Sequence, residues 1–452
     1  MLKKIDISRP ITQYFLGLIL NFIFLITLYS FSPSFINVQI PSGKYLNNIW
    51  NASDVISYVS PAKNYIKHGV FGENMTPDHF RTIGYPALIS FFCFAFGKYW
   101  LLTLQVFQSI IFAFIYPFVS STIKIILPQS NDKLIKTIFL SLFFSGVYFT
   151  RCTMILTDTL FVLLFVISFY FGLKTYMTKN KKYIITYLFL CTITALIRPT
   201  LTLLPLLNIA IGYFVSKHYN LNIKKTFLKS LLISISLFFL INISTLRNYI
   251  NYSFNSPSSV IGLNAFEYLS KKVLISEGKT SDYYAYKNHL NSITDISKKD
   301  KKYKEIMYKT IVDYPISTVK VLSFNTINLF LSDNLISNIS NYYNYNWKIT
   351  KNSYYPYKTS KILYFFTYLL MVIYALLWLL FFLKIIDLLR NCDFKLLFII
   401  SILILMFIVP AILTGDGGAR FRLPFEHILF IFGLTKLFEI KNNQTTRNKN
   451  II

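Results

Sequence analysis

Long apolar runs alternate with short polar segments along most of the chain. Ten of these runs are close to 20 residues, the length of helix that crosses the hydrocarbon core of a bilayer. Backbone groups in lipid must be paired within their own segment, so such runs predict helices. The predicted spans are 11–31, 100–123, 134–150, 157–174, 184–198, 200–216, 226–246, 361–383, 395–413 and 422–438. The pattern therefore predicts an all-α, polytopic membrane protein with about ten transmembrane helices.

Two further apolar stretches are too short to be clear spans. Treating 84–97 as a span would move the lysine-bearing segment 124–136 to the other side of the membrane. We therefore expect 84–97 to be an interfacial or re-entrant helix of the first outer loop. We expect 316–332 to lie on the membrane as an amphipathic helix, with a true span as the alternative.

Basic residues set the predicted orientation. The net charge is +27, and Lys and Arg concentrate in short segments between apolar runs. These segments are 3–9, 124–136, 174–182, 217–229, 384–395 and 436–449. Alternation of this kind follows the positive-inside rule and places both termini in the cytoplasm. The same distribution argues against a nucleic-acid partner, because the positive charge is not gathered on one region of the chain.

The spans divide the chain into three parts. Residues 1–250 form a membrane module that includes a first outer loop, 32–99. Residues 251–360 form an outer region rich in Tyr, Asn, Ser and Lys, and 361–452 hold the last spans and a cytoplasmic tail. Long outer regions are translocated regardless of their charge, so the lysines of 251–360 do not conflict with this topology.

Ionisable residues gather at the predicted outer ends of the spans. They are Asp54, Asp78, Arg81, Arg151, Asp158, Arg198, Arg247, Asp416, Arg420, Arg422 and Glu426. Charge at membrane depth is costly unless it is paired or functional. Carboxylates and arginines that converge on one face therefore indicate a site for an anionic, membrane-borne ligand.

Several of these residues also have a structural interpretation. Asp54 could cap a helix, and Arg198, which precedes a proline, could end a helix and extend to lipid headgroups. Arg151 could pair with Asp158, and Arg420 and its neighbours could bind lipid phosphates generally.

Other chemistries have no signal in the sequence. The five histidines form no ligand spacing, and the four cysteines show no paired spacing. No phosphate-binding P-loop, G-x-S-x-G turn or dinucleotide fingerprint is present. The sequence thus indicates neither nucleotide-driven chemistry nor a histidine metal site.

Six short motifs follow one another on the predicted outer face. They are Asp54 with Tyr58, Ala62, His68, Gly69 and Gly72; Arg81 with Gly84–Tyr85–Pro86; Leu156–Thr157–Asp158; Leu196 with Arg198–Pro199; Arg247–Asn248–Tyr249; and Ala419 to Pro424. In this order they resemble the GT-C superfamily of integral-membrane glycosyltransferases. The branch they resemble is bacterial and is related to protein mannosyltransferases and the aminoarabinose transferase of lipid A. The resemblance covers residues 1 to about 250 and returns at 415–426.

The resemblance implies a reaction at the outer face of the bacterial cytoplasmic membrane. The donor would be a polyprenyl-phosphate sugar, and the acceptor a glycan, a lipid or a protein. An acceptor hydroxyl would attack the anomeric carbon in a single inverting displacement. Asp54 matches the family's catalytic aspartate and would be the general base. Arg81, Arg247 and Arg420, with Arg198 as a fourth, would bind the donor phosphate.

Asp158 is the second catalytic candidate, and it stands where relatives carry Glu. It would orient Arg151 or the acceptor, or contribute to a metal site as in oligosaccharyltransferases. Val55 stands where many relatives carry a second acid, which favours a mechanism without a cofactor or metal and leaves a divalent ion as the alternative. Further site candidates are Tyr58, Asp78, Tyr85, Arg151 and Arg422.

The tyrosine-rich segments of the outer region have two interpretations. Tyrosines in 281–289 and 341–347 could stack on sugar rings, or could reflect the biased composition of the chain.

Two other functions are compatible with parts of this pattern. O-antigen polymerases and ligases also have a large outer loop and essential arginines, but are not expected to carry Asp54 and the GYP motif. A transporter or flippase would place charges near the middle of the membrane, often with internal repeats, and neither feature is visible here.

Overall fold

The computed structural model describes residues 6–31, 54–73, 76–127, 130–144, 152, 155–178, 180–201, 203–218, 220–331, 361–391, 394–414 and 422–449. These residues are helical apart from turns and one short hairpin, β1 (Gly72–Glu73) with β2 (Thr76–Pro77). The all-α prediction is therefore confirmed for the described part of the chain.

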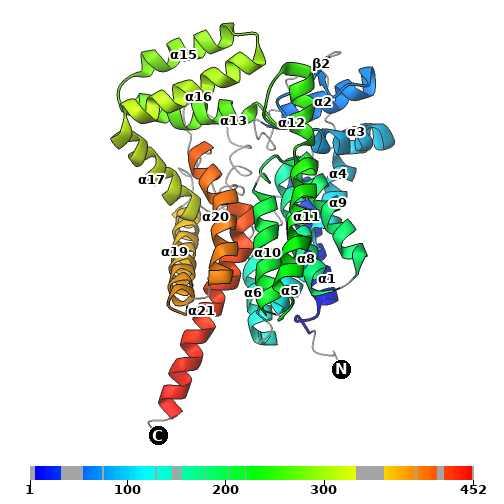
Figure 1. The fold of residues 1–452 in the computed structure, drawn as a ribbon, viewed down its shortest axis with the longest axis vertical. Helices are drawn as coiled ribbons and strands as arrows, with labels where there is room; N and C mark the ends of the chain where they lie inside the picture. Colours follow the sequence, from blue (N-terminus) through cyan, green and yellow to red (C-terminus); the bar gives the residue numbers. More distant parts are fainter. Residues whose placement is uncertain are drawn as a thin grey trace.

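Most helices pack side by side in one bundle (Figure 1). They are α1 (Pro10–Phe31), α4 (Trp100–Phe112), α5 (Ile115–Ile126), α6 (Asp132–Phe144), α8 (Thr157–Met177), α9 (Lys181–Ile197), α10 (Leu204–His218), α11 (Ile223–Ile241), α19 (Lys361–Arg390), α20 (Phe394–Thr414) and α21 (Leu423–Lys449). The predicted span 100–123 is two helices, because the chain turns at 113–114 between α4 and α5.

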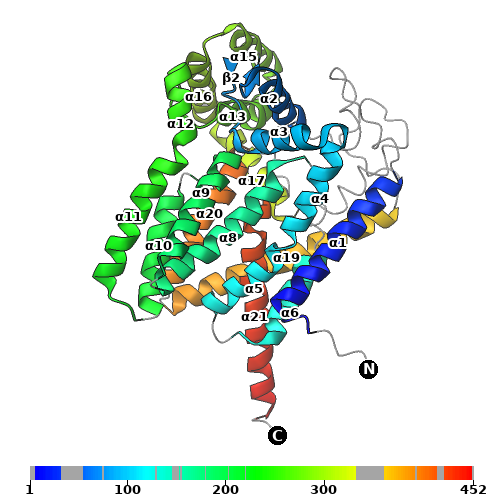
Figure 2. The same cartoon turned by 90° about the vertical axis from the view of Figure 1, so that its right-hand side faces the viewer.

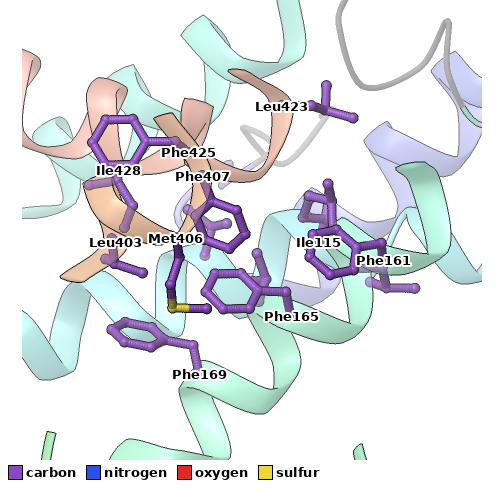
Figure 3. Close-up of a cluster of buried hydrophobic side chains, with 14 of the residues drawn as sticks. Ile115, Phe161, Phe165, Phe169, Leu403, Met406, Phe407, Leu423, Phe425 and Ile428 are labelled. Carbon is purple, nitrogen blue, oxygen red and sulfur yellow. The ribbon is translucent and has the colours of Figure 1, made fainter. Parts of the chain in front are cut away.

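The bundle has a continuous apolar core. α8 is apolar on all sides and buried along its length, so it lies at the centre of the bundle. Its residues Phe161 and Phe165 pack edge-on against Phe407 of α20 (Figure 3). By contrast, α11 exposes large apolar side chains such as Phe239, which is 69% exposed.

Five helical stretches within the described ranges are long and apolar enough to cross a membrane. They are Pro10–Thr27, Gly84–Ile126, Thr157–Met177, Ile223–Tyr252 and Tyr368–Arg390. Exposed apolar side chains on such helices are explained by contact with lipid. The chain is therefore a membrane-embedded protein, while the count of ten spans stays a prediction.

Two helices within the predicted first outer loop lie at one end of the bundle. These are α2 (Val55–His68) and α3 (Gly84–Phe96), which a short turn, η3 (Gly97–Tyr99), joins to α4. Figure 2 shows α3 running across the bundle end, whereas α4 runs down into the bundle. Gly84–Phe96 is thus a helix of its own, and its placement at the membrane surface stays a prediction.

A layer of short helices covers the same end of the bundle. After α12 (Ile243–Tyr252) come α13 (Val260–Asn264), the π-helical segment η4 (Ala265–Ser270), α14 (Lys271–Ser276), α15 (Thr280–Ser292) and α16 (Ile296–Asp313). We call residues 260–313 the cap (Figure 1). The cap has its own apolar core, which includes Phe266, Tyr283 and Tyr303. Tyr283 of the tyrosine-rich segment is thus a core residue, and 341–347 lies outside the described residues.

α17 (Pro315–Leu331) connects the cap to the bundle. It descends obliquely from the cap toward α19 (Figure 1). Asn325 donates to the Ile412 carbonyl of α20 over 3.0 Å, and the ring of Phe330 stacks on Trp378 of α19 at 4.0 Å. The segment expected to lie on the membrane therefore packs against two bundle helices.

The topology can be tested at the turn between α5 and α6. Asp6 contacts Lys136 of α6 over 3.3 Å, so this turn and the N-terminal segment share one end of the bundle. In a cysteine-free background, we expect Asp132→Cys, in the exposed first turn of α6, to react with an impermeant maleimide only after spheroplasts are permeabilised. Ser281→Cys on the exposed face of α15 is the control and should react without permeabilisation. Reaction of position 132 in sealed spheroplasts would contradict the predicted orientation.

Candidate functional site

A cavity of about 800 Å³ lies between the end of the bundle and the cap. It is lined by the first turn of α2, residues 80–82, the start of α8, residues 197–200, the segment 255–268 and α20. Four predicted site residues line it: Asp54, Tyr58, Arg81 and Arg198. A fifth, Asp158, contacts the cavity lining through Arg198.

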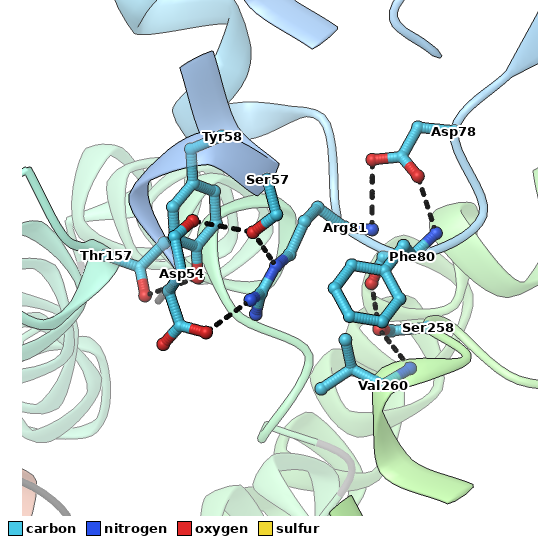
Figure 4. A network of polar contacts seen from close by, with 9 residues as sticks. All are labelled: Asp54, Ser57, Tyr58, Asp78, Phe80, Arg81, Thr157, Ser258 and Val260. Carbon is cyan, nitrogen blue, oxygen red and sulfur yellow. Dashed lines mark hydrogen bonds and ion pairs between the residues drawn. The ribbon is translucent and has the colours of Figure 1, made fainter. Parts of the chain in front are cut away.

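Asp54 and Arg81 form the first ion pair of the site (Figure 4). The Arg81 Nη2 donates to Asp54 Oδ1 over 2.7 Å, and its Nε donates to Ser57 Oγ over 2.8 Å. The guanidinium also lies over the Tyr58 ring, 4.6 Å from the centroid. Asp54 precedes α2, yet its side chain makes no capping hydrogen bond. The helix-cap interpretation is therefore wrong, and the carboxylate is held by Arg81.

Asp158 and Arg198 form the second ion pair. Asp158 lies in the first turn of α8 and its side chain is 1% exposed, and Arg198 ends α9. Arg198 Nη1 donates to Asp158 Oδ1 over 2.6 Å. A buried carboxylate without a cation would be very costly, so this pair is required by the burial of Asp158. The candidate partner Arg151 lies outside the described residues.

The GYP segment brings the two ion pairs together. Thr82 donates to the Ile197 carbonyl over 3.0 Å, one residue before Arg198. A Cβ on Gly84 would lie 2.7 Å from the carbonyl carbon and oxygen of Leu196. The start of α3 can therefore meet the end of α9 only because residue 84 has no side chain.

Tyr85 supports this junction from inside the bundle. It is fully buried, donates to Gln108 over 2.9 Å and packs edge-on against the Tyr58 ring. Tyr58 in turn lies 3.4 Å from the Thr157 hydroxyl, next to Asp158. Tyr85 thus does not line the cavity but fixes a ring that does.

Asp78 and Arg247 lie behind the Arg81 segment and not among the cavity-lining residues. Asp78 accepts hydrogen bonds from the backbone N–H groups of Phe80 (2.7 Å) and Arg81 (3.1 Å). Burial raises the pKa of Asp78, and these bonds oppose the rise. Arg247 donates to Asn248 over 2.8 Å and to the Arg81 carbonyl over 3.4 Å. Both residues therefore shape the backbone that presents Arg81.

The cap attaches to this same segment. Ser258 donates to the Phe80 carbonyl over 2.5 Å, and the Ser259 N–H donates to the His79 carbonyl over 3.1 Å. Figure 4 shows Ser258 and Val260 beside Phe80, on the far side of that residue from Asp54. Residues 79–81 therefore connect both ion pairs to the cap.

Arg422 has a different environment from the other candidates. It is 1% exposed, donates to Glu426 over 2.9 Å and to the carbonyls of Leu329 and Phe330 over 2.8 Å. Its guanidinium also lies over the Tyr374 ring, 3.8 Å from the centroid. Arg422 joins α17, α19 and α21 and is absent from the cavity lining. Arg420 lies outside the described residues.

The cap contributes four polar residues to the cavity lining that were not predicted from the sequence. They are Asn264, Glu267, Tyr268 and Lys304. Glu267 accepts hydrogen bonds from Tyr283 (2.8 Å) and Lys287 (2.9 Å). No local motif marks these residues, because their common location depends on how the cap folds over the bundle.

Metal ligands do not cluster in the described ranges, where no three His, Cys, Asp or Glu side chains come together. Asp54 and Asp158 are each paired with an arginine.

Comparison of the chain with protein-family models, with curated proteins and with solved structures finds no match.

The contact at Gly84 predicts a stability effect. Gly84→Ala forces the start of α3 away from α9, at a cost of about 1–3 kcal/mol for an overpacked site. We expect a lower melting temperature for the purified protein in detergent. Gly172→Ala is the matched control, because its Cβ would meet only the edge of the Tyr187 ring, at 3.1 Å. Equal melting temperatures for the two variants would contradict the assigned role of Gly84.

Arg422 predicts a second stability effect. Arg422→Ala leaves Glu426 buried without its cation, which costs about 3–5 kcal/mol. We expect a large loss in the free energy of unfolding, measured by denaturant titration. The double variant Arg422→Met with Glu426→Leu removes both charges and should recover part of that loss. An equal loss in the single and double variants would show that packing, and not charge, is responsible.

Proposed function

We propose that the chain is a glycosyltransferase that moves a sugar from a polyprenyl-phosphate donor to an acceptor hydroxyl. The observation that best supports this is the cavity in which Asp54, Arg81 and Arg198 meet at one end of an apolar bundle. The proposal places the reaction at the outer face of the bacterial cytoplasmic membrane, with both termini in the cytoplasm.

The arginines are suited to the donor phosphate. Arg81 and Arg198 line one cavity, and each is held in place by a carboxylate. The bonds from Arg81 to Ser57 and Asp54 use Nε and Nη2. A guanidinium has five N–H donors, so Arg81 can hold Asp54 and contact a phosphate oxygen together. Positive charge fixed at the leaving phosphate stabilises the negative charge that develops there.

The apolar side of the cavity is suited to the lipid part of the donor. Leu405, Met406, Phe407 and Pro410 of α20 contribute to its lining, together with Leu203. Such residues can shelter the first units of a prenyl chain whose remainder lies in the bilayer. The phosphate would then be close to the arginines at the bundle end.

Asp54 is suited to the role of general base. Its side chain is 27% exposed and lines the cavity, and Arg81 fixes its orientation. The acceptor oxygen would bond to the anomeric carbon while the bond from that carbon to the phosphate oxygen breaks. The hydroxyl proton would pass to Asp54, and polyprenyl phosphate would leave with its electron pair. This displacement inverts the anomeric centre, and the base contributes roughly 10²–10⁴-fold to the rate.

The experiment is donor turnover with the base removed. Protein in nanodiscs is incubated with a panel of undecaprenyl-phosphate sugars and an envelope extract that supplies acceptors. Release of undecaprenyl phosphate is followed by mass spectrometry. We expect Asp54→Asn to lower turnover by at least about 100-fold, because it keeps the shape and removes the base.

Asp282→Asn is the matched control, since Asp282 lies on exposed α15 outside the cavity lining. It should turn over donor like the unmodified protein. Equal turnover by Asp54→Asn would remove Asp54 from the mechanism. Absence of donor binding and turnover across the panel would favour a polymerase, a ligase or a transporter.

A further inference from the structure

The cap gives the cavity a polar wall that contrasts with the apolar residues of α20. Asn264, Glu267 and Tyr268 contribute to the lining from the cap, and Asn255 and Ser256 contribute from the segment just before it. Lys304 of α16 joins them and is held by an ion pair with Asp300. None of these residues belongs to the ion pairs that the proposed function assigns to the base and the phosphate.

Glu267 is the most firmly held member of this wall. Tyr283, which is 1% exposed in the cap core, donates to one carboxylate oxygen, and Lys287 donates to the other. Burial opposes the charged form, but the bonds from Lys287 and Tyr283 outweigh it and lower the pKa of Glu267. An ionised carboxylate has about four lone-pair sites and is an acceptor only. The two bonds therefore fix its orientation and leave lone pairs for O–H or N–H donors in the cavity.

The local backbone presents Glu267 in an unusual way. It lies in the π-helical segment η4, between α13 and α14. Such segments are rare and often occur at functional sites. α13 packs closely on α16, since a Cβ on Gly262 would lie 2.4 Å from Asp300 Oδ1. The segment that carries Asn264, Glu267 and Tyr268 is thus held between the cap core and the cavity.

Resting on the proposed function, we propose that this wall is the acceptor subsite and that the acceptor is a glycan. The hydroxyl that reacts must lie at Asp54. A Ser or Thr side chain has only that one hydroxyl, whereas a sugar has neighbouring hydroxyls that can donate to Glu267 and exchange hydrogen bonds with Asn264. The Tyr268 ring offers an apolar surface for a sugar face. A site that hydrogen-bonds substrate hydroxyls discriminates strongly against acceptors that lack them.

The test compares acceptors and variants in one assay with a donor that the unmodified protein uses. The acceptor probes are mannotriose, maltotriose, chitotriose and a Ser/Thr-rich peptide that offers backbone N–H donors instead. We expect transfer to at least one trisaccharide and not to the peptide. Glu267→Gln and Glu267→Ala should raise the acceptor KM by about tenfold or more, the range expected for a hydrogen bond to a charged group. The donor KM should stay unchanged.

Two further variants separate recognition from cap stability. Glu305→Gln is the matched control on α16, because Glu305 pairs with Lys302 and does not line the cavity. Lys287→Met removes the nearer of the two lysines beside Glu267, leaves Lys271 at 3.8 Å and keeps the carboxylate. We expect an unchanged acceptor KM for Glu305→Gln, and a smaller change for Lys287→Met than for Glu267→Ala.

The outcomes distinguish this inference from the function it rests on. Three outcomes would overturn the acceptor proposal alone, provided that donor turnover still depends on Asp54. They are transfer to the peptide, transfer to none of the trisaccharides, and an unchanged acceptor KM in both Glu267 variants. If Glu267→Ala and Lys287→Met each changed the donor KM and the acceptor KM by the same factor, the role of Glu267 would be purely structural. Absence of Asp54-dependent donor turnover in every sample would overturn the proposed function, and the acceptor proposal with it.

Discussion

The close approach of two backbone segments, at Gly84 and Leu196, is the constraint on which the site depends. The start of α3 and the end of α9 are distant in sequence, and each carries a cation-bearing residue two or three positions from the contact. Because no Cβ separates them, Thr82 can bond to Ile197, and Arg81 and Arg198 line the same cavity. The rest of the site is built around this junction. Asp78 and Arg247 hold the backbone near Arg81. Ser258 and Ser259, which lead into the cap, donate hydrogen bonds to the carbonyls of residues 80 and 79.

Pairing governs the electrostatics of this junction. Arg81 and Arg198 each bind a carboxylate, so neither cation lies unpaired at the end of the low-dielectric bundle. The two pairs nonetheless differ in environment. Asp54 is partly exposed to the cavity, whereas Asp158 is buried and its role is to fix Arg198. This difference gives a physical reason to assign proton transfer to Asp54 and positioning to Asp158.

The cavity unites two folding units with different cores. The bundle contributes apolar residues from α8 and α20, and the cap contributes polar residues held by a separate core around Phe266 and Tyr283. The contact from Arg422 to the carbonyls of Leu329 and Phe330 joins the end of α17 to α21. α17 therefore has a fixed lower end, which anchors the cap to the bundle on the side away from residues 79–81.

The sequence by itself determined the helical class, the membrane setting and the four residues of the two ion pairs at the cavity. Apolar length forces helices in lipid, and the cost of charge at membrane depth singles out Asp54, Arg81, Asp158 and Arg198. It could not determine which carboxylate pairs with which arginine. Asp158 lies seven positions after Arg151 in the chain but is bound by Arg198, forty positions away. Nor could it separate Arg422, which binds Glu426 one helical turn later, from arginines that reach the cavity.

Only the tertiary structure decided the cap. The composition of residues 260–313 predicts only a polar outer region, yet these residues fold into helices around a tyrosine-containing core. This packing places Glu267 and Lys304 in one wall of the cavity. Local patterns report which face of a helix is apolar, but a cavity between two folding units is defined by contacts between segments with no fixed spacing in sequence. The residues proposed to bind the acceptor are therefore visible only when the cap is folded onto the bundle.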